Sequence, residues 1–446
     1  MKKILILGAG MSSSTLIQYL IDCSHRQGWK ITVADRNPEL AKSKTNGHAN
    51  TEAILLDIDN SMQLEQLIAA HDVVISMLPA RMHPMIAQSC LKTATHMVTA
   101  SYVSDEVKAM DGEARSKGIA MLNELGVDPG IDHMSAMKLV DSIRQQGGEI
   151  LLFKSSTGGL VAPEYDNNPW NYKFTWNPRN VVLAGQGTSM FIRNGRYKYI
   201  PYHQLFKRVE KTTVLDYGEF EVYPNRDSLK YRSIYDLKDI PTIFRGTLRR
   251  PGFSRAWDVF VQLGMTDDTY QMQNVTDMTW RQFVNSFLRY DPHAKVEDKL
   301  CAYLGLPRHG EVMNKLQWLG IFDDIPIDME EGTPAQILQK LLEEKWALHP
   351  GDRDMIAMQH IIEYRLNGKH KRITSSMVIK GKEKPHTAMS ITVGTPVAIA
   401  VKLLLKGKIK LSGVHVPTRP EIYQPLLEEL EETGVRFVDE EEDIEM

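Results

Sequence analysis

Two glycines near the start of the chain, Gly8 and Gly10, have the spacing of a phosphate-binding turn. The apolar segment ILIL (4–7) precedes them and a helical stretch follows. Gly8 would allow the tight turn, and Gly10 would let a pyrophosphate approach the free N–H groups at the helix N-terminus. Ser13 replaces the usual third glycine, and its small side chain still permits helix–strand packing. The pattern indicates a dinucleotide site; the alternative is a strand-to-helix turn that binds no ligand.

An acidic and a basic residue, Asp35 and Arg36, follow the second apolar segment, WKITVAD (29–35). A carboxylate at this place hydrogen-bonds the ribose 2′-hydroxyl of NAD, whereas an adjacent arginine suits the 2′-phosphate of NADP. Because the two residues favour different cofactors, the sequence leaves the choice between them open. Arg36 is equally consistent with a solvated surface charge.

Later apolar segments end in residues that would lie at the same edge of a sheet. Asp57 belongs to the end of AILLDID (53–59), and Met77 and Leu78 belong to the end of DVVISMLP (72–79). Ligands of open α/β sheets bind outside the carboxyl ends of the strands. We therefore add these three residues to the candidate cofactor site.

Asp128 follows the sixth apolar segment, IAMLNELG (119–126), and has two interpretations. With Pro129 behind it, it would be a good N-cap for the helix that comes next. At the carboxyl end of a strand, it would also face the nicotinamide end of a cofactor cleft. The two roles do not exclude each other. His133, one turn into that helix, is most simply a core histidine.

The first 125 residues alternate short apolar segments with helical ones. Runs of four to seven apolar and β-branched residues are typical of strands buried on both faces of a parallel sheet. The alternation predicts an α/β fold with a right-handed, doubly wound parallel sheet, the Rossmann type. The predicted strands are 4–7, 29–35, 53–59, 72–79, 96–101 and 119–126.

The rest of the chain indicates a second, mixed α/β domain with a mainly helical insert. Segments on either side of Asn194-Gly195 alternate like the strands of a hairpin. Residues 256–370 carry helical apolar stripes, and 375–394 resembles a returning hairpin. The apolar TPVAIAVKLLLKGK that follows is expected to be a buried helix packed on a sheet.

Basic residues gather in the second domain, where their guanidinium groups could bind the carboxylates of an anionic substrate. Ordinary surface charge is the alternative for this cluster, although less so for Arg226 in its Pro-Asn-Arg-Asp turn. The cluster comprises Arg226, Arg232, Arg245, Arg249, Arg250 and Arg255.

Composition and charge exclude several classes of function. A net charge of −3 and a pI near 6.5 give no reason to expect nucleic acid or an anionic membrane as a partner. The three cysteines lie far apart, outside any Cys/His cluster, which argues for a reducing compartment and against a metal site. We expect no signal peptide and no run long enough to span a bilayer, hence a cytoplasmic protein. The acidic end, DEEEDIEM, is interpreted as a solvated tail.

Longer strings identify a family resemblance. The chain resembles saccharopine dehydrogenases of the NADP-dependent, L-glutamate-forming type, nearly from end to end. The most specific strings are SYVSDEVKAMD, NELGVDPGIDHMSA, GGLVAPEYDNNPWNYKFTWNPR, YPNRDS, RGTLRRPGF, LQWLGIF and GTPVAIAVK.

The resemblance implies a reversible reaction of lysine metabolism, in which saccharopine, water and NADP⁺ give L-glutamate, 2-aminoadipate 6-semialdehyde and NADPH. It implies a homodimer with three parts. Residues 1–127 form the Rossmann domain, to which 394–446 returns; 128–255 with 371–393 form the substrate and dimerisation domain; and 256–370 form the helical subdomain.

The resemblance also assigns binding residues. Substrate-contacting segments contain Ser101, Tyr102, Asp128, Thr157 and Arg226, to which we add Arg245 from the basic cluster. Cofactor-contacting segments contain Gly8, Gly10, Met11, Ser12, Arg36, Met77, Leu78, Leu125, Val127 and Pro129. The reaction needs a group that takes the proton of the secondary amine. We expect Asp128 or Tyr102 to do so, directly or through water, with His133 as a weaker candidate.

The chain departs from the fungal pattern at two informative positions. Thr157 stands where a fungal relative has cysteine, so the chemistry here requires no thiol. Asp35 stands where the fungal pattern has an uncharged residue, and a carboxylate there would repel a 2′-phosphate. NADP(H) is therefore expected from the resemblance, with NAD(H) left open by Asp35.

Two other functions compete with this interpretation. A related imine reductase, such as a carboxynorspermidine-type enzyme, would act on a more cationic amine and need more acidic residues; the run RGTLRRPGFSR argues against it. A non-catalytic NAD(P)-binding sensor would keep the nucleotide site without turnover.

Overall fold

The computed structural model describes residues 1–445, which form two compact units. Unit 1 comprises Met1–Glu149 and Met377–Val438, and unit 2 comprises Ile150–Ser376 with the segment from Asp439 onward. Residues 128–149, which we had assigned to the second domain, therefore lie in unit 1. The reason is packing: the helix over 131–145 lies against a C-terminal helix of the same unit, where Tyr423 donates a hydrogen bond to Asp141.

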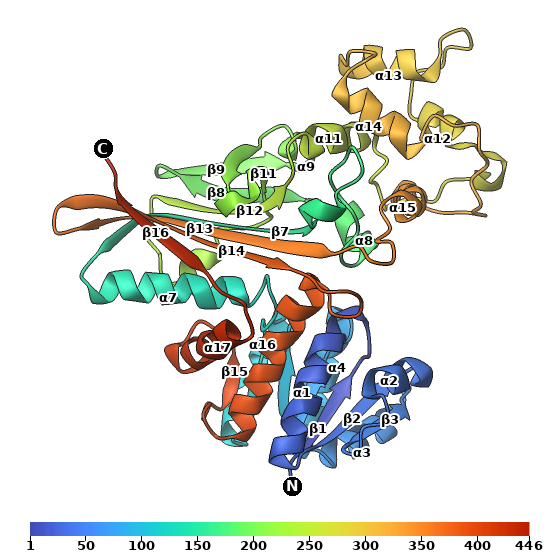
Figure 1. The fold of residues 1–446 in the computed structure, drawn as a ribbon. Coiled ribbons are helices and arrows are strands. Elements are labelled where there is room, and N and C mark those ends of the chain that lie inside the picture. Colours follow the sequence, from blue (N-terminus) through green and yellow to red (C-terminus); the bar gives the residue numbers. More distant parts are fainter. Residues whose placement is uncertain (446) are drawn as a thin grey trace. The chain divides into compact units, whose positions relative to one another are not determined.

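Unit 1 is built on a seven-stranded parallel sheet (Figure 1). Its strands are β1 (Lys3–Leu7), β2 (Lys30–Asp35), β3 (Thr51–Leu55), β4 (Val73–Ser76), β5 (His96–Thr99), β6 (Ala120–Leu122) and β15 (Gly413–His415). They are ordered β15–β6–β5–β4–β1–β2–β3, and their pairings are parallel. The chain moves outward from β1 in one direction and then in the other, so the predicted doubly wound Rossmann sheet is confirmed.

Both faces of this sheet are covered. Ile4 and Leu5 point to opposite faces of β1, and both are fully buried. Leu5 belongs to a core cluster with residues of the four helices over 61–69, 83–93, 105–109 and 111–116. Other helices cover the opposite face of the sheet (Figure 1). The helices of unit 1 are the 3₁₀ turn η1 (Met11–Ser13), α1 (Ser14–Gln27), α2 (Pro38–Thr45), α3 (Ser61–Ala69), α4 (His83–Thr93), α5 (Asp105–Ala109), α6 (Asp111–Ser116), α7 (Ile131–Gln145), α16 (Ala388–Leu405) and α17 (Pro420–Glu432).

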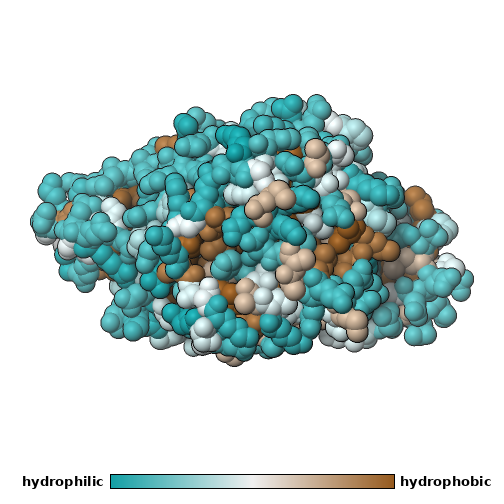
Figure 2. Space-filling model, turned by 90° about the horizontal axis from the view of Figure 1, so that it is seen from below, coloured by the Kyte–Doolittle hydropathy of each residue, from teal (hydrophilic) through white to brown (hydrophobic). Residues whose placement is uncertain are grey.

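Helix α16 corrects two expectations from the sequence. Residues 388–394 open this helix instead of forming a hairpin strand, because the Thr387 side chain accepts a hydrogen bond from the N–H of Ser390 and caps it. By length and composition α16 could also cross a membrane, contrary to our expectation that no run could. It is nevertheless 72% buried, and it packs against α1 and α17 inside unit 1. The face of the molecule in Figure 2 is mostly hydrophilic, with apolar residues in separate patches.

Unit 2 contains a nine-stranded mixed sheet. Its strands are β7 (Glu149–Val161), β8 (Thr188–Arg193), β9 (Arg196–Pro201), β10 (Glu210–Thr213), β11 (Glu219–Pro224), β12 (Thr242–Arg249), β13 (Asp354–Leu366), β14 (Lys369–Lys380) and β16 (Val438–Asp443). The main path is β10–β11–β12–β7–β13–β14–β16, and β8 joins β9 to β12. The predicted hairpin is confirmed: β8 and β9 are antiparallel and joined by Asn194-Gly195, both at positive φ.

Strand β13 was wrongly predicted as helix. Its first seven residues are all buried, so the alternation that usually marks a strand is missing. The turn after it, Asn367-Gly368 with φ of 51° and 77°, is the hairpin signal that the periodicity argument overlooked. The acidic end is also more ordered than predicted, because β16 forms the sheet edge and pairs its carboxylates with Lys369, Lys371 and Arg372 of β14.

The rest of the insert is helical, as predicted, and encloses an aromatic core. Trp170 and Trp346, both fully buried, meet at 5.2 Å between ring centroids. The helices of unit 2 are α8 (Pro178–Val182), α9 (Tyr202–Leu205), α10 (Tyr231–Ile234), α11 (Phe253–Leu263), α12 (Trp280–Ser286), α13 (Val296–Leu304), α14 (Glu311–Leu319) and α15 (Pro334–Lys345).

A glycine fixes the approach of α16 to α1, which lie side by side in Figure 1. A Cβ added at Gly394 would lie 2.9 Å from the Ser12 carbonyl oxygen and 3.1 Å from the Leu16 backbone nitrogen. Distances this short with backbone atoms cannot be relieved by turning a side chain. The start of α1 would have to move instead.

We predict that Gly394→Ala lowers the free energy of unfolding of unit 1 by roughly 1–3 kcal/mol through overpacking. Gly112→Ala is the matched control, because Gly112 is also helical and a Cβ there meets nothing within 4 Å. That control is expected to be neutral or to gain about 0.5–1 kcal/mol from its lower chain entropy. Thermal unfolding of both variants, followed by circular dichroism, is the measurement; equal melting temperatures would contradict the packing argument.

Candidate nucleotide and catalytic site

The glycine turn after β1 has the geometry of a phosphate cradle. Gly8 has φ of +101°, and a Cβ on it would lie 3.1 Å from the Met77 carbonyl oxygen. A Cβ on Gly10 would meet nothing within 4 Å, so this side of the turn is open to a ligand. Ser13 is buried, and its hydroxyl donates to the Gly10 carbonyl at 2.8 Å, which explains how serine serves in place of glycine. Neither N-cap residue, Gly10 for η1 and Ser13 for α1, makes a side-chain cap bond, although the Thr15 N–H in α1 donates to Ser390 Oγ at 3.1 Å. The N–H groups at the start of η1 are therefore the ones placed for an anion.

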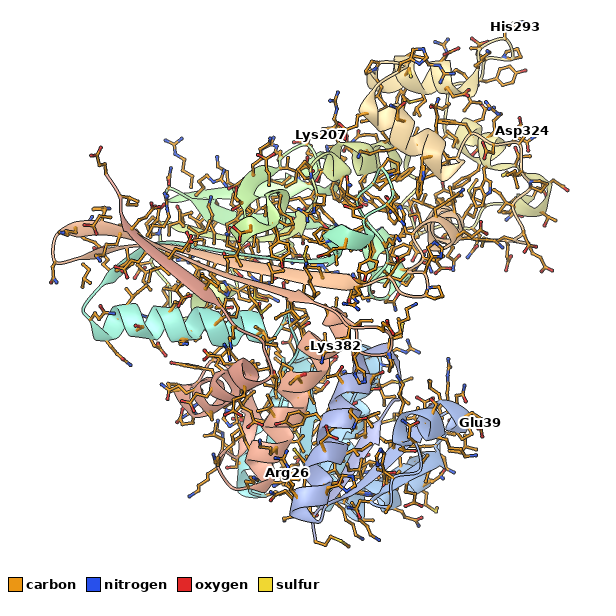
Figure 3. The ribbon with its side chains drawn as sticks, viewed as in Figure 1. Arg26, Glu39, Lys207, His293, Asp324 and Lys382 are labelled. Atoms are coloured by element: carbon orange, nitrogen blue, oxygen red, sulfur yellow. The ribbon has the colours of Figure 1, made fainter. Side chains whose placement is uncertain are left out.

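The start of α16 supports this turn. Thr15 Oγ1 lies 3.2 Å from His386 Nδ1 and 2.9 Å from Ser390 Oγ, within hydrogen-bond distance of both. Figure 3 labels Lys382, in the segment before α16, near the start of α1, and Arg26 in the last turn of α1. A segment from the last sixth of the chain therefore holds the first helix in place.

Asp35 is fully engaged with the backbone. Its Oδ2 accepts the N–H of Ala9 at 2.7 Å, and its Oδ1 accepts the N–H of Asn37 at 2.8 Å. The carboxylate thus joins the glycine turn to the turn that follows β2. Arg36 lies beside it with an exposed side chain. The glycine turn, the start of η1 and the exposed guanidinium together fit a dinucleotide that carries an extra phosphate.

The other residues assigned to the cofactor are divided between exposed and buried positions. Exposed or half-buried are Met11, Ser12, Asp57, Met77 and Leu78; buried are Leu125, Val127 and Pro129. Asp57 lies two residues beyond β3, which ends earlier than predicted, and its side chain accepts the N–H of Asp59. The three buried residues offer little side-chain surface to a ligand.

Tyr102 and Asp128 are brought together at the carboxyl edge of the sheet. The Tyr102 hydroxyl donates to Asp128 Oδ1 at 3.3 Å, and 42% of the tyrosine is exposed. Their segments follow β5 and β6, which are neighbours. A phenol and a carboxylate in this arrangement can pass a proton between themselves and a ligand.

The interpretation of Asp128 as a helix cap is wrong. Helix α7 begins at Ile131 with Gly130 as its N-cap, and the Asp128–Pro129 peptide is cis. The N–H groups of Ile131 and Asp132 donate to the carbonyls of 126 and 127, and the N–H of Gly130 donates to Asp132 Oδ1. Backbone carbonyls and the Asp132 carboxylate thus accept the N–H groups of residues 130–132.

Ser101, the first substrate candidate, is held by a buried histidine. His83 Nε2 lies 2.8 Å from Ser101 Oγ, and His83 Nδ1 lies 2.9 Å from Ser76 Oγ. Burial lowers the pKa of His83 to about 4. The imidazole is therefore neutral at physiological pH, so one ring nitrogen donates and the other accepts.

We predict that His83 stays neutral well below pH 6.5, and that the free energy of unfolding falls as the pH drops from 6.5 towards 4. The unfolded state binds the additional proton in this window, because the folded pKa is the lower one. The full difference corresponds to about 3 kcal/mol. Ring ¹⁵N chemical shifts recorded against pH measure the titration, and the signal missing in His83→Gln identifies the residue. A midpoint near 6.5 would contradict this.

Sequence reasoning missed a third acidic residue at this edge. Glu124 is 5% exposed, accepts the N–H of Val103 at 3.0 Å and lies 2.7 Å from His133 Nε2. His133 is fully buried, as the core-histidine interpretation expected. The available signal was a glutamate inside the apolar segment IAMLNELG, since an acidic residue is rarely buried without a partner.

In unit 2, the candidate substrate residues lie on, or just after, three neighbouring strands. Thr157 lies on β7 and Arg245 on β12, and the parallel register pairs Thr157 with Thr247, which puts both candidates on one face. Arg226 lies in the turn after β11 with an exposed side chain and φ of +36°. Arg245 is buried, donates to the Tyr231 hydroxyl at 2.6 Å and lies over its ring. The Thr157 hydroxyl is buried and makes no hydrogen bond among the described residues.

Several arginines of the predicted basic cluster have structural partners. Arg249 is buried against Tyr172, Tyr223 and Phe253. Arg232 bonds Tyr197 and the Lys238 carbonyl, Arg250 donates to the Tyr217 carbonyl, and Arg255 is exposed. Within residues 1–445 no group of three or more His, Cys, Asp or Glu side chains could hold a metal ion.

Comparison with known proteins decides the family. Residues 4–122 match the sequence model named Saccharopine dehydrogenase NADP binding domain, and residues 126–435 match that named Saccharopine dehydrogenase C-terminal domain. The chain belongs to the saccharopine dehydrogenase family. The resemblance seen in the sequence is thereby confirmed, and the residues of the glycine turn lie in an NADP-binding domain. The family is one of oxidoreductases.

Individual members of this family are similar over their whole length. The chain is 32% identical to the saccharopine dehydrogenase [NADP(+), L-glutamate-forming] of Schizosaccharomyces pombe, over 99% of each chain. The solved apo saccharopine dehydrogenase (L-Glu forming) of Saccharomyces cerevisiae matches with a TM-score of 0.90 and 31% identity, covering 99% of this chain and 100% of that one. A homospermidine synthase of Legionella pneumophila, in complex with NAD, matches with a TM-score of 0.56 and 9% identity over 99% and 92% of the two chains, which is a likeness of fold alone.

Proposed function

We propose that this protein oxidises saccharopine to an imine that water hydrolyses to L-glutamate and 2-aminoadipate 6-semialdehyde, with NADP⁺ as the cofactor. The observation that carries the proposal is the full-length similarity to saccharopine dehydrogenases, at 31–32% identity. The reaction belongs to lysine metabolism, which fits the names of the relatives. We also propose a cytoplasmic homodimer that needs neither nucleic acid nor a membrane.

The residues of the carboxyl edge suit this chemistry. When bound, NADP⁺ supplies the hydride acceptor. Asp128, with the Tyr102 hydroxyl 3.3 Å away, would take the proton of the secondary amine and later assist the attack of water on the imine. Thr157, Arg226 and Arg245 are the candidates of unit 2 for binding substrate carboxylates. Thr157 has no thiol, so no sulfur chemistry enters the proposal.

Asp35 supports the choice of NADP⁺ over NAD⁺. Both of its oxygens accept backbone N–H groups, those of Ala9 and Asn37. The dipoles of these N–H groups offset part of the negative charge of the carboxylate. The carboxylate is thus a structural part of the glycine turn, and the exposed Arg36 beside it is the natural partner of a 2′-phosphate.

The purified protein should reduce NADP⁺ when saccharopine is supplied, measured by nicotinamide absorbance, and should release glutamate. Asp128→Asn is predicted to lower kcat by about 10²- to 10⁴-fold, because the proton acceptor is lost. NADPH binding, followed by its fluorescence, should be retained. Asp105→Asn is the control, since that carboxylate is exposed in α5 of the same unit. Nucleotide binding without turnover of saccharopine would favour the sensor or the carboxynorspermidine-type alternative.

Cofactor preference can be tested at Arg36 and Asp35. Arg36→Gln is predicted to weaken NADP⁺ binding by roughly 10- to 100-fold, the value of a charge-assisted contact, with little effect on NAD⁺. Asp35→Ala should weaken both cofactors, because the glycine turn loses its acceptor. Lys42→Gln, on exposed α2, is the control. If Asp35→Ala improved NADP⁺ binding, repulsion by the carboxylate would be the dominant effect, and our assignment of Asp35 would be wrong.

A further inference from the structure

A single residue, Glu124, holds the backbone on both sides of Tyr102. Its own N–H donates to the Ser101 carbonyl at 3.0 Å, and its Oε1 accepts the N–H of Val103, also at 3.0 Å. Tyr102 is the residue between these two bonds. Its backbone can therefore move little without breaking one of them.

Glu124 is itself held in one conformation. Its φ of +59° lies in the left-handed region, which is unfavourable for a residue with a side chain. It is buried, and its second carboxylate oxygen lies 2.7 Å from Nε2 of the fully buried His133. Burial and hydrogen bonds on both oxygens thus fix the carboxylate, which is the condition for it to fix something else.

His133 lies in the first turn of α7, directly after the turn that carries Asp128. The turn with Asp128 closes on itself, because the N–H of Gly126 donates to the Pro129 carbonyl at 2.8 Å. A Cβ on Gly130 would lie only 2.1 Å from the Gly126 carbonyl oxygen, so the two backbones are in direct contact. The first turn of α7, with His133 in it, continues from this structure.

We propose that Glu124, oriented by His133, is a positioning residue that sets the Tyr102 hydroxyl against Asp128 during saccharopine oxidation. This inference rests on the proposed function. The pair connects two segments, 101–103 and 126–133, each of which carries one of the proton-transferring groups. The 3.3 Å separation of those groups is long for a bond between two oxygens. A site that must shorten this bond on binding substrate needs both segments held in register.

A buried glutamate–histidine pair could equally serve stability alone, so the test must separate the two roles. Five proteins are compared: the wild type, Glu124→Ala, Glu124→Gln, Tyr102→Phe, and the double variant that combines Glu124→Ala with Tyr102→Phe. Tyr423→Phe is the control, because it removes a 2.7 Å hydrogen bond to Asp141 on α7, the helix that carries His133.

Glu124→Ala is expected to lower kcat by about 10-fold or more, because a small displacement of a reacting group is costly. NADPH binding should stay within about 2-fold, and Glu124→Gln, which keeps an acceptor for Val103, should recover much of the loss. In the Tyr102→Phe background the same substitution should change kcat by less than about 2-fold, since its effect passes through the lost hydroxyl. Tyr423→Phe should lower stability without lowering kcat.

Equal losses from Glu124→Ala in both backgrounds would overturn the inference and leave the pair a structural one. An NMR measurement decides independently of turnover. With tyrosine labelled at its ζ carbon, the Tyr102 signal, identified by its absence in Tyr102→Phe, should shift in Glu124→Ala and stay in place in Tyr423→Phe. A shifted signal in a protein that did not oxidise saccharopine would contradict the proposed function and support the positioning. An unmoved Tyr102 signal would overturn the positioning.

Discussion

Where the chain leaves the parallel sheet at its carboxyl edge, the backbone N–H groups of the turns need hydrogen-bond acceptors. In unit 1, carboxylate side chains are the acceptors for several of these N–H groups. Asp35 accepts from the glycine turn and from the turn after β2, and Glu124 and Asp132 do the same for the segments after β5 and β6. An unpaired buried N–H group would cost about 1–3 kcal/mol at each of these places. The acidic residues therefore make possible the turns from which the site is built.

The same arrangement explains how an acidic edge can suit anionic ligands. Each of these carboxylates faces N–H dipoles, which oppose its charge. The start of η1 and the exposed Arg36 supply positive charge to the same part of the unit. Asp128 differs from the other acids at this edge. It accepts from the Tyr102 hydroxyl, a group that can both give and take a proton. Asp35, Glu124 and Asp132 accept backbone N–H groups. Bonding partners thus separate the structural acids from the candidate catalytic one.

Much of this fold could be predicted from the sequence, because unit 1 repeats one pattern. Six apolar segments alternate with helices, and each became a strand of the sheet, although most ended a few residues early. The wrong secondary-structure predictions concern buried segments, in which the alternation of apolar and polar residues is missing. β13 is buried on both faces and resembles a helix in composition, and the start of α16 is β-branched yet capped by Thr387. In such segments tertiary packing overrides local preference.

The candidate site was predictable where spacing along the chain defines it. Gly8, Gly10, Asp35 and Arg36 have fixed offsets from β1 and β2, so they could be found by counting. Glu124 could not, because its importance comes from Val103 and His133, which the sequence places on different elements. Spacing located the Asp35 carboxylate, and the structure adds which N–H groups it accepts, those of Ala9 and Asn37.

The path of the chain has a consequence for biosynthesis. The sheet of unit 1 is finished by β15, in which Val414 donates its N–H to Asp111, 303 residues earlier. On a ribosome, the N-terminal part of unit 1 emerges first but cannot close its hydrophobic surface until α16 and β15 have been made. The intervening segment, Ile150–Ser376, has all its strands but β16 available earlier. The usual order, in which the N-terminal domain folds first, is thus reversed, and the nascent first domain is the part that needs protection from aggregation.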